Sequence, residues 1–431
     1  MRSLILMIQK TYQLAERDGS RQVMDNVAFL SGLQAITFFL PIFVIPYLFQ
    51  VIGPEKFGLI SFAQAFVIYF MILTDYAFNI SATKKISLFQ GDNTTASEIF
   101  SAVMTAKIIL VLLSLFIFAA ILRFVPKFST DQTLYTLSFG AVIGNALFPL
   151  WLFQGMEKMK YIARLKMFGE FAYAFGIFLW VRGPADYLAV PIVTSSVSLF
   201  TGIMGIGIVF WRLKLSLKFP RLKHVRREIR AGKDLFLSIV AINAYTTTRV
   251  FAVGLLTNNT LTGFYSIAEK IASMAQTFPL ASFSQAIFPR LSNIFRKNRA
   301  KAFLLMQQVQ SITVRISLIS LPLILILTSF IIRIVCGGDY PQATMTLRLL
   351  LISVFFVSAN AFRVQFLLVC GKPRSYSRIH IIMASIGLPL LLLLIHLFSY
   401  LGAAMATVIT EAGIFTLTYI TVKRLQKNYS P

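Results

Sequence analysis

Charged residues are scarce in this chain of 431 residues, and acidic residues are the scarcest of them. Asp and Glu total 16 against 41 Lys and Arg, and the four types together make up 13% of the sequence. A soluble globular protein carries about 25% charged residues, so this low content argues against a soluble domain. Disorder is excluded as well, because disordered segments have low hydrophobicity and hydrophobic residues here reach 57%.

The chain also has few of the residues from which catalytic and metal sites are built. It has three histidines and two cysteines, Cys336 and Cys370, which stand far apart near the ends of apolar runs. No His, Cys and Asp cluster has the spacing of a metal site, and no Gly-x-x-x-x-Gly-Lys-Ser/Thr phosphate loop is present. We therefore expect no metal, no cofactor and no ATPase activity, and we expect both cysteines to be buried, unreactive thiols.

Long apolar runs make up most of the sequence, and the mean hydropathy is +0.75. Runs of about 20 residues are long enough to cross a bilayer as helices. They are continuous, whereas the strands of a membrane barrel alternate apolar and polar residues. The sequence thus predicts an all-α polytopic membrane protein. Its twelve transmembrane helices are expected at 27–51, 59–79, 101–122, 134–153, 167–181, 187–211, 235–256, 264–288, 309–332, 347–369, 379–398 and 401–422.

The basic residues predict the orientation of these helices. If the N-terminus is cytoplasmic, 30 Lys and Arg fall on the cytoplasmic side, five fall in outside loops and six lie within spans. An excess of Lys and Arg is typical of cytoplasmic loops. Both termini are therefore expected in the cytoplasm, the N-terminal segment as residues 1–26 and the C-terminal tail as residues 423–431. The bias also accounts for most of the net charge of +25 without nucleic acid as a partner.

The most basic stretch, 212–234, lies midway and is interpreted as a cytoplasmic linker. It is either an orientation signal or an amphipathic surface helix that contacts anionic lipid headgroups.

Two pairs of similar segments indicate an internal duplication. Gly58-Leu59-Ile60-Ser61-Phe62-Ala63-Gln64 opens the second span, and Gly263-Phe264-Tyr265-Ser266-Ile267-Ala268-Glu269 opens the eighth. Asn145-Ala146-Leu147 in the fourth span is matched by Asn360-Ala361-Phe362 in the tenth. Parallel repeats of six spans place a substrate path between two lobes. We expect an N-lobe at 27–211 and a C-lobe at 235–422, related by a pseudo-two-fold repeat around a central cavity.

Ionisable residues inside the spans are candidates for function, because a charge within the bilayer is costly and usually faces a cavity or a partner. The second half carries more cations than acids, which favours an anionic substrate. The alternative is that the cations pair with carboxylates of neighbouring helices, Lys270 with the adjacent Glu269. Lys107 and Arg348 lie close enough to span ends to extend to the interface. The candidate substrate-binding cations are Arg249, Arg363, Lys270 and Arg315, and the candidates for ion coupling are Asp75, Glu170 and Glu411.

Several segments resemble a known family. These are Pro46-Tyr47 with Ile52-Gly53-Pro54-Glu55-Lys56-Phe57-Gly58, then Trp151-Leu152-Phe153-Gln154-Gly155-Met156-Glu157-Lys158-Met159, then Gly263 through Ile271, and Phe288-Pro289-Arg290-Leu291-Ser292. Together they are similar to the O-antigen flippases (Wzx type) of the polysaccharide transporter family, within the multidrug/oligosaccharidyl-lipid/polysaccharide exporter superfamily.

The resemblance implies a flippase of the bacterial inner membrane. Such a protein moves an undecaprenyl-diphosphate-linked oligosaccharide from the cytoplasmic to the periplasmic leaflet by alternating access, in contact with membrane lipids. It implies coupling to a proton or sodium gradient as an option, and a polysaccharide polymerase and a chain-length regulator as partners. Two alternatives stay open: a drug or small-cation exporter of the same superfamily, and a membrane-embedded polysaccharide polymerase or ligase.

Overall fold

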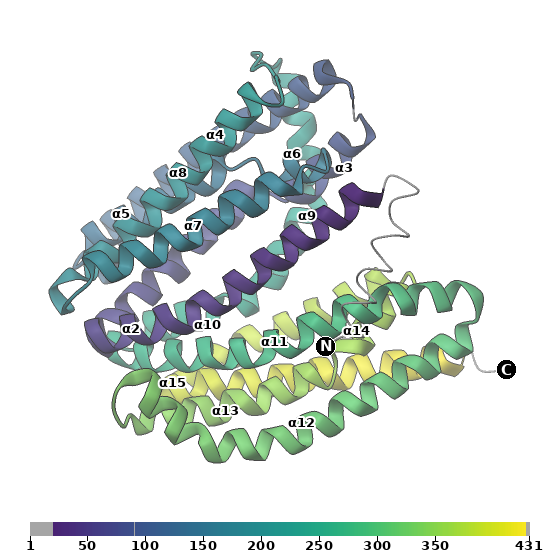
Figure 1. The fold of residues 1–431 in the computed structure, drawn as a ribbon. Coiled ribbons are helices and arrows are strands. Elements are labelled where there is room, and N and C mark those ends of the chain that lie inside the picture. Colours follow the sequence, from purple (N-terminus) through teal and green to yellow (C-terminus); the bar gives the residue numbers. More distant parts are fainter. Residues whose placement is uncertain (1–19, 90, 428–431) are drawn as a thin grey trace. The chain divides into compact units, whose positions relative to one another are not determined.

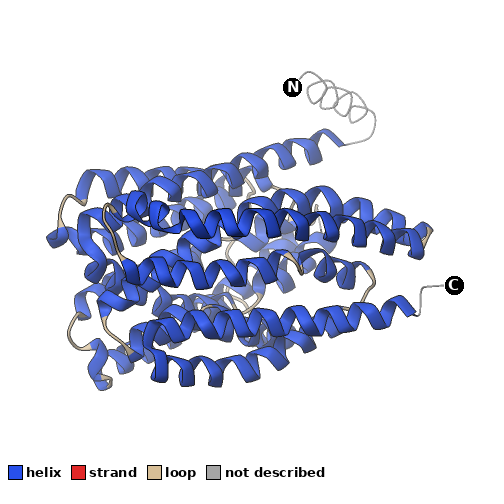
Figure 2. Cartoon of the chain, turned by 90° about the horizontal axis from the view of Figure 1, so that it is seen from below, coloured by secondary structure: helices blue, strands red, loops and turns tan. Residues whose placement is uncertain are grey.

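The described part of the chain is a set of α-helices joined by short turns (Figures 1 and 2). The computed structural model describes residues 20–89 and 91–427, so most of the predicted segment 1–26 and the end of the tail 423–431 lie outside the described residues. The helices are α2 (Ser20–Asp75), α3 (Phe78–Leu88), α4 (Asn93–Phe124), α5 (Gln132–Leu147), α6 (Leu150–Gly155), α7 (Met159–Trp180), α8 (Ala189–Trp211), α9 (Leu222–Thr246), α10 (Thr248–Leu256), α11 (Asn259–Lys297), α12 (Arg299–Cys336), α13 (Pro341–Ser358), α14 (Ala361–Val369) and α15 (Pro373–Lys427).

These helices form two compact units. Of the described residues, the first contains those up to Val44, Val67–Arg182 and Leu188–Phe236, and the second contains Ile45–Phe66, Gly183–Tyr187 and those from Leu237 onward. Residues 45–66, which include the end of the first predicted span and the start of the second, thus pack with the second half of the chain. The division into lobes at 27–211 and 235–422 stays a prediction.

Seven helical stretches among the described residues are long and apolar enough to cross a membrane. Two of them, Phe39–Leu88 and Arg374–Gln426, have 50 and 53 residues, more than twice the length that one crossing needs. The seven stretches cover nine of the twelve predicted spans. The fifth, seventh and eighth spans correspond to α7, to α9 with α10, and to α11, which are helical but less apolar. The membrane-protein class is therefore supported, whereas the count of twelve stays a prediction.

Two of the expected boundaries between spans appear as kinks within continuous helices. Gly53 in α2 has a φ of 76°, and Ser399 in α15 has a φ of 54°. Glycine adopts positive φ without steric cost, and Pro54 can restart a helix directly after it because the first turn needs no amide donor there. These kinks fall between the first and second predicted spans and between the eleventh and twelfth.

The fourth predicted span and the tenth, which is the fourth span of the second half, are both broken helices. α5 stops at Leu147 and α6 restarts at Leu150, where Pro149 lacks the amide proton that a continuous helix needs. α13 stops at Ser358 and α14 restarts at Ala361. Each break lies within about one helical turn of the matching Asn145 or Asn360. The similarity seen in the sequence therefore extends to local conformation.

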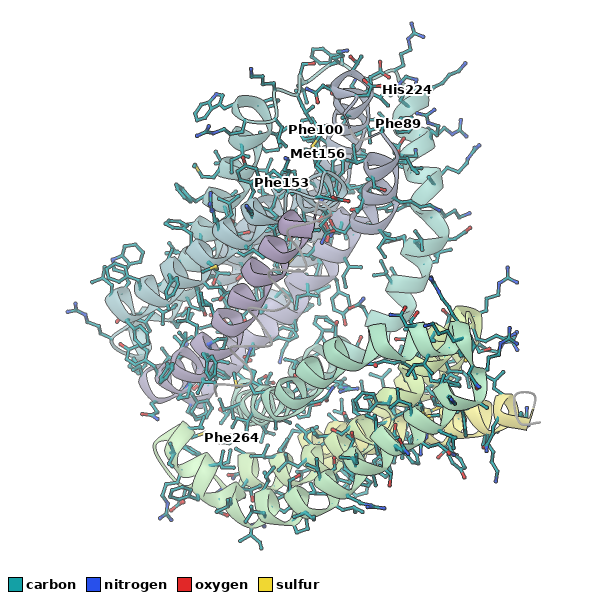
Figure 3. All side chains as sticks on the ribbon, turned by 45° about the vertical axis from the view of Figure 1, so that its right-hand side comes forward. Phe89, Phe100, Phe153, Met156, His224 and Phe264 are labelled. Atoms are coloured by element: carbon teal, nitrogen blue, oxygen red, sulfur yellow. The ribbon has the colours of Figure 1, made fainter. Side chains whose placement is uncertain are left out.

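A large aromatic core holds the first unit together. Phe100, Trp151 and Phe153 are almost fully buried and pack in one cluster that joins α4 and α6 to α3 (Figure 3). The first half of α9 is attached to this unit by an ion pair, in which the half-buried Lys85 ammonium lies 2.6 Å from the buried Glu228 carboxylate. The basic linker 212–234 is thus helical from Leu222 onward, and this helix packs on the first unit.

In the second unit, the glycine of each copy of the repeated motif packs against the backbone just before the glycine of the other copy. A Cβ atom added to Gly58 would meet the Asn259 carbonyl oxygen at 1.8 Å, and one added to Gly263 would meet the Pro54 carbonyl oxygen at 2.0 Å. Asn259 and Pro54 each stand four residues before the glycine of their own motif. The contact is therefore reciprocal, and only glycine permits the two backbones to come this close.

Candidate functional site

Arg249 lies at the start of α10, directly after the break that separates α9 from α10 at Thr247. Its guanidinium Nη2 is 3.1 Å from the Glu411 Oε1 of α15, and both side chains are only 15% exposed. A hydrogen-bonded pair of this kind keeps a charge in an apolar surrounding, where an unpaired charge would be very costly. The structure thus brings together a predicted substrate-binding cation and a predicted ion-coupling acid.

Glu269 and Lys270 of α11 complete this group. Glu269 interacts electrostatically with Arg249 and with Lys270. Arg249, Glu269, Lys270 and Glu411 comprise two cations and two carboxylates, and we call them the ion-paired cluster after the Arg249–Glu411 pair. The cavity that adjoins Arg249, next to Gly387 and Thr407, measures about 10 Å³. That is about the space of one water molecule, so this small cavity cannot hold a headgroup.

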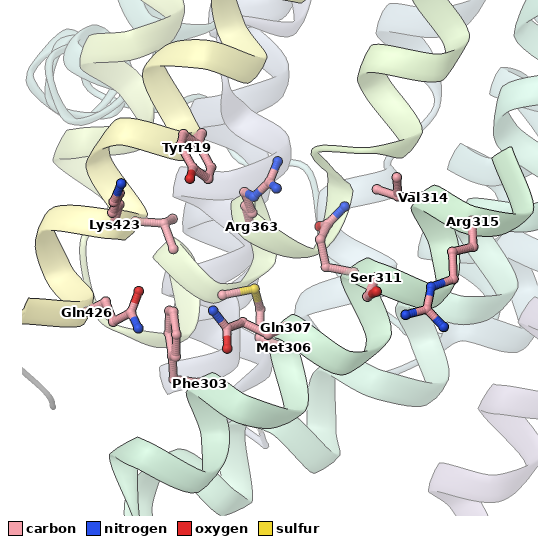
Figure 4. Close-up of a pocket in the computed structure, with 12 residues that line it drawn as sticks. Phe303, Met306, Gln307, Ser311, Val314, Arg315, Arg363, Tyr419, Lys423 and Gln426 are labelled. Atoms are coloured by element: carbon pink, nitrogen blue, oxygen red, sulfur yellow. The ribbon is translucent and has the colours of Figure 1, made fainter. Parts of the chain in front are cut away.

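The other two predicted cations line a larger cavity in the second unit. Arg315 of α12 and Arg363 of α14 share a cavity of about 490 Å³ with Lys423 of α15. Figure 4 shows Arg363 and Tyr419 facing Gln307 and Ser311 across this space, with Lys423 and Arg315 toward its two ends. The remaining polar lining consists of Gln310 and Gln426. We call this space the basic cavity.

Arg363 is held in place by the helix break next to it. Its Nη1 donates a hydrogen bond of 3.0 Å to the Ala359 carbonyl oxygen, which also accepts from the buried Gln310 amide. The guanidinium carbon lies 4.8 Å from the centre of the Phe415 ring and 5.1 Å from that of Tyr419. A guanidinium over aromatic faces is stabilised without an anionic partner.

Asp75 lies in the first unit, where α2 ends. Its Oδ1 is 3.0 Å from the Lys107 Nζ of α4, and its Oδ2 accepts a 2.9 Å hydrogen bond from the Asn79 amide. Lys107 is 1% exposed, so the expectation that Lys107 extends to the membrane interface is wrong. The cause is the nearby carboxylate, which the chain places opposite Lys107 by ending α2 at two residues with positive φ, Tyr76 and Ala77.

Glu170, the third predicted ion-coupling acid, is half-buried on α7 in the first unit. The nearest opposite charge that acts on it is Lys166, one helical turn earlier. Glu170 and Asp75 therefore lie on different helices of the first unit and interact with different lysines. Within the described residues, no three His, Cys, Asp or Glu side chains gather as a metal site would require.

Sequence reasoning missed Lys423 and the glutamines of the basic cavity. Lys423 was assigned to the tail, yet Tyr419, Lys423 and Gln426 follow one another at the spacing of a single helix face. On α12 the polar residues Gln307, Gln310 and Ser311 recur at the same helical period. That periodicity was the available signal, because polar residues on one face of an otherwise apolar helix indicate a polar neighbour.

The comparison with known proteins agrees with this architecture. Residues 23–295 match the family described as polysaccharide biosynthesis protein. A protein of Escherichia coli (strain K12) assigned as an O-antigen transporter is 31% identical over 92% of this chain and 96% of its own length. A protein of Shigella dysenteriae with the same assignment is 24% identical over 92% of this chain and 99% of its own length.

Among solved structures, a lipid II flippase MurJ in an inward closed conformation has a similar fold. The TM-score is 0.76 at 13% sequence identity, over 92% of this chain and 87% of that one. The family match covers more than half of the chain, and the Escherichia coli relative matches it nearly from end to end. The chain therefore belongs to the polysaccharide biosynthesis protein family.

Proposed function

We propose that this protein is a flippase for a lipid-linked oligosaccharide, as a multi-pass protein of the bacterial inner membrane. The observation that carries the proposal is the near full-length relationship to an O-antigen transporter, combined with the fold shared with a lipid II flippase. The substrate we propose is an undecaprenyl-diphosphate-linked repeat unit of O-antigen or a similar surface polysaccharide. It would move from the cytoplasmic to the periplasmic leaflet by alternating access between two lobes.

The charges of the second unit support an anionic substrate over a drug cation. A lipid diphosphate carries about two negative charges, and outward transfer of each is favoured by about 2.3 kcal/mol per 100 mV when the inside is negative. The protein then has to lower the barrier for the polar headgroup, which cations can do. Arg249, Lys270, Arg315 and Arg363 are the proposed cations, although the first two are offset by carboxylates in this conformation.

Coupling to a proton or sodium gradient is proposed at the acids that already meet a cation. Glu411 pairs with Arg249, and Asp75 pairs with Lys107. Binding of a proton or sodium ion to either carboxylate would weaken its pair and release a buried cation. Glu170 stands apart as a third candidate. We propose no enzymatic step and no cofactor, and a polymerase and a chain-length regulator as downstream partners.

The sidedness of the lipid-linked oligosaccharide tests this function in cells. In a strain without the gene, spheroplasts would be treated with a membrane-impermeant glycan label, and the total lipid-linked repeat units would then be extracted. The proposal expects units that accumulate but stay inaccessible from outside. Normal exposure with failed polymerisation would instead identify a downstream enzyme.

The cation assignment has its own test in the same assay. Arg249→Ala and Arg363→Ala should each abolish outward exposure at equal protein level, because each removes a charge proposed to meet the headgroup. Arg348→Ala is the matched control, because Arg348 is an exposed arginine of α13 that hydrogen-bonds Thr328 outside both candidate sites. Normal exposure with both residues replaced would remove Arg249 and Arg363 from the substrate path.

A further inference from the structure

The basic cavity differs from the ion-paired cluster in its charge balance. Arg249 and Lys270 face Glu411 and Glu269, whereas the lining of the basic cavity contains Arg315, Arg363 and Lys423 and no carboxylate. Among the ion pairs between described residues, none involves these three cations. Three cations around one cavity repel one another, so an anion that enters gains from all three at once.

One aromatic ring brings two of these charges together. The Arg363 guanidinium lies 5.1 Å and the Lys423 ammonium 5.9 Å from the centre of the Tyr419 ring. The ring offsets part of the repulsion through its negative face, but it cannot neutralise either charge. The arrangement thus places two hydrogen-bond donors beside one ring that lines the cavity, and phosphate oxygens accept such charge-assisted hydrogen bonds.

The position of the cavity along the helices indicates the depth of its ligand. The uncharged run Ile316–Ile332 of α12 separates Arg315 from Arg333. At a rise of 1.5 Å per residue this run spans about 26 Å, close to the thickness of the bilayer core of about 30 Å. Arg315 and Arg333 therefore mark the two membrane interfaces. Arg315 is on the side where the positive-inside rule places the cytoplasm.

The other lining residues agree with an interfacial depth. Lys423 follows directly on the last predicted span, 401–422, and Tyr419 stands one turn before it, as interfacial aromatic residues do. Phe303, Met306, Val314 and Val422 supply apolar lining beside the cations. A cavity with both cationic and apolar lining at this depth suits a molecule with a phosphate head and a hydrocarbon tail.

We propose that the basic cavity binds the phosphate headgroup of an anionic lipid in the cytoplasmic leaflet, with Arg315, Arg363 and Lys423 as its phosphate ligands. The lipid is either the lipid diphosphate of the proposed substrate or a resident phospholipid, since both present the same chemistry. In the first case the site deepens the proposed function, which it then presupposes. Lipid binding is measured without transport, so a failure of the site and a failure of flipping are distinguishable.

The test measures lipid binding to the purified full-length protein in neutral detergent by native mass spectrometry. The probes are phosphatidylglycerol, undecaprenyl diphosphate and inorganic pyrophosphate. Arg315→Gln, Arg363→Gln and Lys423→Gln should each weaken binding of the preferred lipid at least tenfold. Arg424→Gln should change binding less than twofold, because Arg424 is the exposed neighbour of Lys423 and does not line the cavity.

The probes separate the two lipid sources. Preference for undecaprenyl diphosphate identifies the substrate lipid, and equal or stronger binding of phosphatidylglycerol identifies a resident phospholipid. Binding of pyrophosphate as tight as that of either lipid would overturn the assignment to a lipid headgroup. The site itself is overturned if the three cavity variants bind lipid like Arg424→Gln. Arg315 is exposed on the surface of α12, so its variant keeps the test valid if the Arg363 variant fails to fold.

Discussion

At the scale of single residues, two pairs of charges within the predicted spans are explained by a partner on another helix. Lys107 meets Asp75, and Arg249 meets Glu411. In both pairs the partners are far apart in sequence, so a reading of the chain finds the charges but not the pairing. Arg315 and Arg363 take part in no ion pair between described residues and line the basic cavity instead. Charge alone therefore does not distinguish a structural cation from a ligand-binding one.

The Asp75–Lys107 pair leads to a prediction about stability. Asp75→Ala leaves a fully buried ammonium without its anion and should lower the free energy of unfolding by about 3 kcal/mol or more. Adding Lys107→Met removes the uncompensated charge and should restore much of that loss. Thermal unfolding of the purified variants measures both effects. A double variant no more stable than Asp75→Ala would contradict the pairing.

Cys370 leads to a prediction about reactivity. It lies in the turn between α14 and α15, and burial raises the pKa of its thiol to about 11. The thiolate is the reactive form, so at pH 7.5 alkylation of Cys370 should be roughly 300-fold slower than that of an ordinary cysteine. In a Cys336→Ser background, the rate with N-ethylmaleimide should still rise between pH 9 and pH 11. A rate equal to that of free cysteine at pH 7.5 would refute this.

At the scale of helices, the two halves of the chain share local structural features. The fourth and tenth spans are both broken, and the glycines that open the second and eighth spans make a reciprocal contact. Such a reciprocal contact is what a two-fold axis imposes on equivalent residues. The reciprocity supports the duplication expected from the sequence.

The reciprocal contact can be tested by adding one methyl group. Gly58→Ala and Gly263→Ala each place a Cβ within about 2 Å of a backbone oxygen, so the two segments must separate. Each should lower the free energy of unfolding by about 1–3 kcal/mol. Gly207→Ala in α8 is the control, because nothing lies within 4 Å of the added atom. Thermal unfolding in detergent distinguishes them, and equal stability of all three variants would contradict the close approach.

Helix breaks show how far the sequence could predict this fold. Pro149 indicates the break between α5 and α6, because proline lacks an amide proton. No proline stands at the break at Ala359–Asn360. There, Gln310 of a different helix and Arg363 both donate hydrogen bonds to the Ala359 carbonyl oxygen. The first break follows from a residue at the break itself. The second is supported by tertiary contacts, which a linear reading does not contain.

At the scale of the whole molecule, composition and charge distribution predicted the class of protein. Membrane helices and the relationship to polysaccharide transporters follow from apolar runs and from short motifs, and the family match confirms that relationship. The candidate site was only partly predictable. Arg363 and Arg315 were identified individually, but their partnership with Lys423 depends on how α12, α14 and α15 pack.

The central claim is that this chain alone moves a lipid-linked oligosaccharide across a bilayer. Purified protein in vesicles with a radiolabelled lipid-linked repeat unit tests it most directly, using a membrane-impermeant reagent that modifies the terminal sugar. Protein-free vesicles limit modification to the outer leaflet. With the protein present, we expect modification to continue until the inner-leaflet lipid is consumed. Modification that stops at the level of protein-free vesicles would contradict the flippase assignment.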